Sequence, residues 1–110
     1  MNIAYQSKKL KKQLTQPKEL IRSFGQMARK VNQRIEELKA ATTLSVMQTI
    51  PAARCHELTG DRKGQLAVQV SVNYRLIFEP NHEPIPAKVD GGLDWEAVTA
   101  ITIIDIEDYH

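Results

Sequence analysis

Alternation of apolar and polar residues in the middle of the chain constrains its fold more than any other feature. Apolar side chains occupy every second position from Leu66 to Val72, with polar or small residues between them. A period of two is typical of a strand with one buried face. Residues 73–78 form a second run of strand-forming side chains, and residues 54–57 form a short run before a glycine-containing turn. Short connections between such runs predict an antiparallel meander.

Helical periodicity dominates the chain before this block. Ser7 is predicted to cap a helix that ends before Pro17. A second helix is predicted from about residue 17 to about residue 40, because apolar residues three and four apart trace one stripe along it. Gly25 is expected to weaken this helix locally. The remaining elements are predicted as an edge strand at 2–6, a long proline-broken loop at 80–95 and a buried strand at 97–106.

Length and composition place broad limits on the chain. A length of 110 residues predicts a single domain, 1–110, with one modest core. No apolar run is long enough to span a bilayer, and the first residues lack the order of a secretion signal. Cys55 is the sole cysteine, which excludes an internal disulfide and disfavours a thiolate metal cluster. We therefore expect a reducing, cytoplasmic environment.

Charge is distributed unevenly along the chain. Residues 1–39 hold ten Lys and Arg against three Asp and Glu, a net charge of +7, whereas residues 77–110 carry a net charge of −7. A basic half beside an acidic half indicates a nucleic-acid partner, although solvated helix faces explain the charge alone equally well. On the first helix, lysines cover the side away from its leucines: Lys8, Lys9, Lys11 and Lys12.

The strand block combines a histidine with fixed cations. His56 comes just before a turn that contains Arg62 and Lys63, and Arg54 shares its side of the predicted strand. Such a set suits chemistry on a phosphate. The structural alternatives remain open, because a lone strand histidine is usually structural and a basic turn can be a solvated hairpin tip.

Arg75 and the C-terminal residues are the other candidates for chemistry. Arg75 lies in the middle of a strand, where a charge needs a polar cleft or a partner such as Glu57 or Asp105. Asp, Tyr and His side chains together can position, donate and accept protons. That combination ends the chain as Asp108, Tyr109 and His110. The histidines match no common metal-ligand spacing, and no serine elbow or phosphate-binding glycine loop is present.

These motifs, in this order, resemble the HigB branch of the RelE/ParE toxin superfamily, the "plasmid maintenance killer" proteins. The similar segments are HELTGDRKG at 56–64, NYRLIF at 73–78 and DYH at 108–110. The resemblance implies an α+β fold, with two N-terminal helices packed on a small twisted antiparallel sheet. It implies a toxin that cleaves mRNA in the ribosomal A site without a metal or cofactor. It also implies a HigA-type helix-turn-helix antitoxin as partner.

The resemblance assigns roles to individual residues. His56 and Arg75 match the family's histidine and arginine, and Thr59 stands where many members have a lysine. The implied reaction is attack by an RNA 2′-hydroxyl on its neighbouring phosphate. The implied catalytic set is His56, Arg75, Asp108, Tyr109 and His110. The cations expected to contact RNA are Arg54, Arg62, Lys63, Lys8, Lys9, Lys11 and Lys12.

Two other functions stay open from the sequence. A ParE-type toxin that poisons DNA gyrase would share the fold without RNA chemistry, and the histidine-containing clusters argue against it. A non-enzymatic domain that binds nucleic acid or an antitoxin-like partner is the second alternative. The sequence does not distinguish which histidine would act as base and which as acid.

Overall fold

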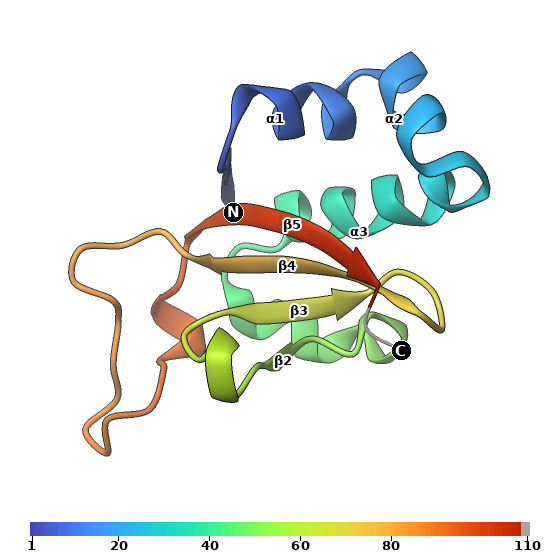
Figure 1. Ribbon diagram of the computed structural model, residues 1–110. Coiled ribbons are helices and arrows are strands. Elements are labelled where there is room, and N and C mark those ends of the chain that lie inside the picture. Colours follow the sequence, from blue (N-terminus) through green and yellow to red (C-terminus); the bar gives the residue numbers. More distant parts are fainter. Residues whose placement is uncertain (109–110) are drawn as a thin grey trace.

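Five strands form one sheet in the computed structural model, which describes residues 1–108. The strand order is β1-β5-β4-β3-β2 (Figure 1). β2, β3 and β4 pair antiparallel in chain order, which confirms the predicted meander. β5 pairs antiparallel with β4, whereas β1 pairs parallel with β5. The sheet is therefore mixed at its β1 edge. The strands are β1 Asn2–Tyr5, β2 His56–Glu57, β3 Leu66–Gln69, β4 Tyr74–Pro80 and β5 Ala100–Asp108.

Three α-helices precede β2, where we expected two. α1 begins after its predicted N-cap, because the Ser7 hydroxyl accepts the backbone N–H of Leu10 at 3.0 Å. The predicted second helix is interrupted at Gly25, whose φ of +54° and ψ of −123° place it where residues with a Cβ are strained. The helices are α1 Lys8–Thr15, α2 Pro17–Phe24 and α3 Ala28–Ala40, with a 3-10 turn at Gly25–Met27 before α3.

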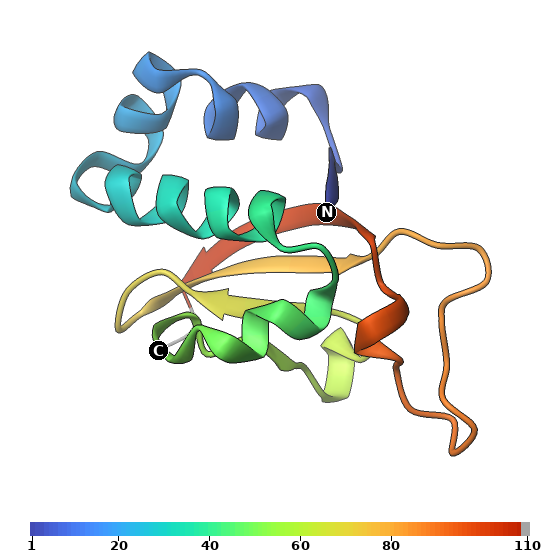
Figure 2. The same cartoon turned by 180° about the vertical axis from the view of Figure 1, so that it is seen from behind.

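The main core lies between α3 and one face of the sheet, as the view from behind shows (Figure 2). α3 contributes a fully buried stripe that includes Ile35 and Leu38, and β4 contributes Leu76 and Phe78. α1 and α2 lie past α3, beyond the β1 edge of the sheet (Figure 1 and Figure 2), and their buried leucines belong to the same cluster. Among the described residues, no helix is both long and apolar enough to cross a membrane.

The opposite face of the sheet carries the residues of chemical interest. Consecutive residues of a strand point to opposite faces. Leu66 and Val68 therefore reach the main core, while Ala67 joins Ile77 and Leu58 in a smaller cluster on the other face. The α-helices leave this second face uncovered (Figure 1).

The β3–β4 hairpin departs from the predicted alternation at its tip. The backbone N–H groups of Val70 and Ser71 both donate to the Tyr74 carbonyl, at 2.9 and 3.1 Å. This closes the turn after Gln69, so Val72 stands at the tip and is 81% exposed instead of buried. The period of two identified the strand correctly but extended it too far.

The segment between β4 and β5 is a long loop, as predicted, and its base is anchored by a histidine. The Nε2 atom of His82 accepts backbone N–H groups from Thr99 at 3.0 Å and Ala100 at 3.3 Å. His82 therefore holds the start of the loop against the start of β5.

Candidate active site

A hollow of about 310 Å³ opens on the uncovered face of the sheet, lined by Arg54, His56, Gln69 and Arg75. Gln69 of β3 and Arg75 of β4 are direct cross-strand neighbours, and His56 of β2 lies opposite Ala67. The antiparallel register therefore brings together side chains that are up to 21 positions apart in the sequence, from 54 to 75. Three of the predicted site residues meet here.

His56 is held in one tautomer by its own chain. Its Nδ1 atom lies 2.6 Å from the backbone carbonyl oxygen of Arg54. A carbonyl can only accept, so Nδ1 carries the hydrogen and donates it. In the neutral ring this leaves a lone pair on Nε2, the nitrogen available to accept a proton. The left-handed backbone of Arg54, with φ of 46°, places that carbonyl two residues before the histidine.

Arg75 is paired with Glu107 across the β4–β5 ladder. Its Nε and Nη2 atoms donate to Oε1 of Glu107 at 2.9 and 2.6 Å. The alternative ionic partners named from the sequence, Glu57 and Asp105, are not the ones found, and Glu107 takes that place. Arg75 and Glu107 are direct Cα partners, and a register shift between Ile77 and Phe78 sets that alignment.

A second arginine binds the same carboxylate. Nη2 of Arg62 donates to Oε2 of Glu107, and its Nη1 donates to the Gln65 side chain at 2.8 Å. Burial by itself raises the pKa of Glu107, but hydrogen bonds and charge from Arg75 and Arg62 together lower that pKa below its ordinary value. Glu107 is therefore ionised near neutral pH. Reasoning from sequence missed it, because only the strand register reveals its partners.

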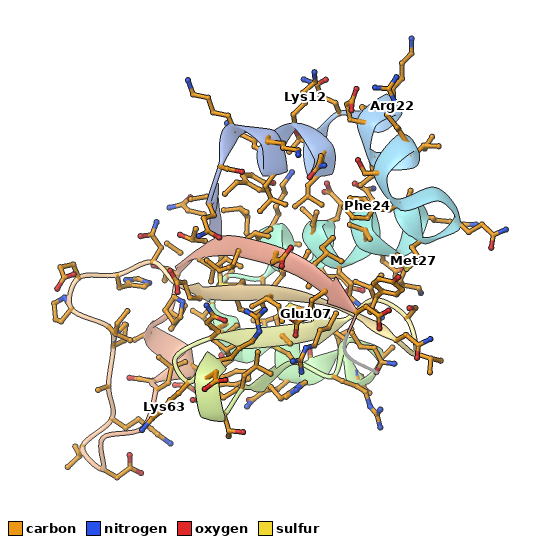
Figure 3. All side chains as sticks on the ribbon, in the orientation of Figure 1. Lys12, Arg22, Phe24, Met27, Lys63 and Glu107 are labelled. Carbon is orange, nitrogen blue, oxygen red and sulfur yellow. The ribbon has the colours of Figure 1, made fainter. Side chains whose placement is uncertain are left out.

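The other predicted cations lie elsewhere. Lys63 borders a larger groove of about 890 Å³ between the β2–β3 connection and the 81–94 loop. Figure 3 shows Lys12 on the outer side of α1, pointing away from the sheet, while Glu107 lies over the uncovered face. None of the lysines of α1 lines the hollow, and all are exposed: Lys8, Lys9, Lys11 and Lys12.

The C-terminal candidates divide at the end of β5. Asp108 is the Cα partner of Tyr74, so strand alternation directs it to the face opposite Glu107, and it does not line the hollow. Tyr109 and His110 lie outside the described residues. Within residues 1–108, no group of three or more His, Cys, Asp or Glu side chains is placed to hold a metal ion. Burial raises the pKa of Cys55 to about 12, which makes its thiol a poor nucleophile near neutral pH.

Comparison with known families identifies the chain. Residues 4–90 match a family described as "RelE-like toxin of type II toxin-antitoxin system HigB". The chain belongs to this HigB-like toxin family. The resemblance first drawn from the motifs is thus confirmed. The matched residues of this HigB-like toxin include His56, Arg62 and Arg75, and they end before Glu107.

Solved structures show the same fold at low sequence identity. A YoeB/ParE toxin from Agrobacterium tumefaciens aligns with 12% identity and a TM-score of 0.56, over 100% of both chains. A YoeB–YefM complex from Staphylococcus aureus aligns with 14% identity and a TM-score of 0.57, over 100% of this HigB-like toxin and 97% of the other chain. No curated protein sequence matches. The α+β fold expected from the resemblance is confirmed, with the additional helix noted above.

Proposed function

We propose that this HigB-like toxin is a ribosome-dependent endoribonuclease that cleaves translated mRNA. The observation that carries the proposal is the hollow in which His56, with Nε2 ready to accept a proton, faces an oriented arginine, Arg75. RelE-like toxins are generally endoribonucleases, which supports the same assignment. In this proposal a single domain, residues 1–110, carries the activity.

His56 would act as the general base. Its Nε2 takes the proton of an RNA 2′-hydroxyl, while the Nδ1–H bond to the Arg54 carbonyl keeps the ring in place. The 2′-oxygen then attacks the adjacent phosphorus, the bond to the 5′-oxygen breaks, and the products carry a 2′,3′-cyclic phosphate and a 5′-hydroxyl. A positioned base contributes on the order of 10²- to 10⁴-fold to such a reaction.

Arg75 would stabilise the negative charge that develops on the phosphate oxygens. A planar guanidinium matches phosphate geometry, and its pairing with Glu107 means that little reorganisation is needed during the reaction. An acid must also protonate the leaving 5′-oxygen. The resemblance implies a catalytic cluster at residues 108–110, and we assign this step to His110. Asp108, which does not line the hollow, takes no direct part in the step.

The dispersed cations suggest why a ribosome is required. The hollow holds two arginines, whereas the exposed lysines of α1 lie on another surface. That surface suits phosphates of ribosomal RNA, which would hold the toxin while the ribosome presents the mRNA in line for attack. Lys63 and Arg54 are further candidates for RNA contact. In this proposal the toxin acts in the cytoplasm.

An antitoxin completes the proposed system. Membership of a type II toxin family and the fold shared with a YoeB–YefM complex both support a protein antitoxin as partner. We propose that it is a helix-turn-helix protein of the HigA type, as the motif resemblance implies.

The test is cleavage of a short mRNA on purified, programmed ribosomes. Wild-type toxin is compared with His56→Gln, Arg75→Gln and the control Arg22→Gln, which removes a cation from α2 that is 80% exposed. We expect the first two variants to lose at least about 10²-fold in kcat. The control should cleave normally, and the products should carry 5′-hydroxyl ends. Growth arrest by the wild type with no such ends, or with breaks in DNA, would contradict the nuclease.

A further inference from the structure

Glu107 lies between two arginines and outside the hollow that one of them lines. Its Oε1 accepts two N–H groups of Arg75, and its Oε2 accepts one from Arg62. The side chains of Glu107 and Arg75 are each 20% exposed, so the pair is largely removed from solvent. Arg75 thus borders the hollow while Glu107, which does not line it, binds the guanidinium.

The carboxylate brings together two like charges that would otherwise repel. Both guanidiniums lie within hydrogen-bond distance of one carboxylate, so they are only a few ångströms apart. A free arginine side chain has many rotamers, and a charge-assisted pair with two N–H donors to one oxygen restricts them. Without Glu107, repulsion and rotamer freedom would both move Arg75 from its place.

Arg62 binds the Glu107 carboxylate from the connection between β2 and β3, near the other edge of the sheet. It belongs to the turn Gly60–Arg62 between β2 and β3, and its partner is in β5, so the two side chains together bridge the width of β3 and β4. Ala67 of β3 and Ile77 of β4 lie on this face of the sheet and are 0% exposed, although no α-helix covers the face (Figure 1). Arg62 is 32% exposed and makes its hydrogen bonds to Gln65 and Glu107.

We propose that Glu107 is a positioning residue for RNA cleavage, held in place by Arg62, and that it acts by orienting Arg75 toward the hollow. The inference rests on the proposed nuclease function. It changes the expected role of Arg62 from a direct RNA contact to a support of Glu107. Loss of either residue should then lower kcat and leave the KM for programmed ribosomes nearly unchanged.

The test compares Glu107→Gln with Asp105→Asn in the ribosome cleavage assay. Asp105 is an exposed carboxylate on the same strand and face, and its Oδ1 accepts the adjacent Ile106 N–H at 2.8 Å. Both variants remove one negative charge, so the change in long-range electrostatic attraction between the toxin and RNA is the same in both. We expect Glu107→Gln to lower kcat by on the order of 10- to 100-fold with KM within about twofold, because small misplacements of a reacting group have effects of this size. Asp105→Asn should keep the wild-type kcat.

Arg62→Gln provides a second route if Glu107→Gln folds poorly. It should lower kcat in the same way, and the Arg62→Gln/Glu107→Gln double variant should be little worse than Glu107→Gln alone, because the two residues act in series. A folded Glu107→Gln with wild-type kcat, an equal loss in Asp105→Asn, or an Arg62→Gln that raises KM alone would each overturn the positioning role while the nuclease stands. Absence of cleavage by the wild type would instead refute the nuclease and the inference together.

Discussion

Arg34 offers the most quantitative test of how the helical layer is attached to the sheet. Its side chain is only 3% exposed, and among the described residues it alone is both charged and buried. Its Nε donates to the carbonyl of Gln69 at 2.7 Å, its Nη2 to that of Ala52 at 3.1 Å, and its Nη1 to Glu37 at 2.9 Å. Arg34 therefore joins α3 to the end of β3, next to the hollow.

Arg34→Ala should lower the free energy of unfolding by about 3–5 kcal/mol, the usual cost of removing one partner from a buried ionic network. The change deletes the packed stem and leaves two carbonyls short of a donor. Small domains are typically stable by roughly 5–15 kcal/mol in total, so the loss is a large share. At about 4 °C per kcal/mol, the melting temperature should fall by roughly 12–20 °C.

Urea denaturation followed by circular dichroism measures this loss. Arg34→Met keeps most of the volume but no hydrogen bonds, so its stability should lie between those of Arg34→Ala and the wild type. Arg29→Ala is the control, because Arg29 is exposed on the same helix. A loss below about 1 kcal/mol for Arg34→Ala, or an equal loss for Arg29→Ala, would refute the reasoning.

Three further predictions concern separate features. Gly25→Ala should lower the free energy of unfolding by on the order of 1–3 kcal/mol through backbone strain alone, since no atom beyond the two neighbouring residues lies within 4 Å of the added Cβ. Urea denaturation measures this loss, and an unchanged stability would contradict the strained turn. Because its pKa is lowered on folding, ionised Glu107 should stabilise the toxin above the pKa of the unfolded carboxyl, and that contribution should disappear as pH falls through the lower folded value. The stability difference between wild type and Glu107→Gln should therefore shrink in acid, and a constant difference would count against the pairing. Replacing all four lysines of α1 by Gln should weaken co-sedimentation with ribosomes and its salt dependence without a change in melting temperature, and unchanged co-sedimentation across a salt series would exclude that surface.

Local sequence patterns determined much of the secondary structure and the family. The N-cap at Ser7, the stripe of α3 and the alternation from Leu66 each depend on residues within one or two turns or on neighbouring strand positions. Such short-range preferences act before any tertiary contact forms, so they can be recognised in the chain itself. The motif order identified the HigB-like family for the same reason, because each motif is contiguous.

Only the tertiary structure decided which charged groups meet. Arg75 and Glu107 are 32 positions apart and Arg62 and Glu107 are 45 positions apart. Their contact depends on strand order and on the register shift within the β4–β5 pair, which packing of the whole sheet determines. The burial of Arg34 is decided in the same way, because it needs carbonyls from two distant segments. The lysines of α1 lie away from the hollow because the leucines of the same helix face the core. A count of charges along the chain does not show which way the lysine side chains point.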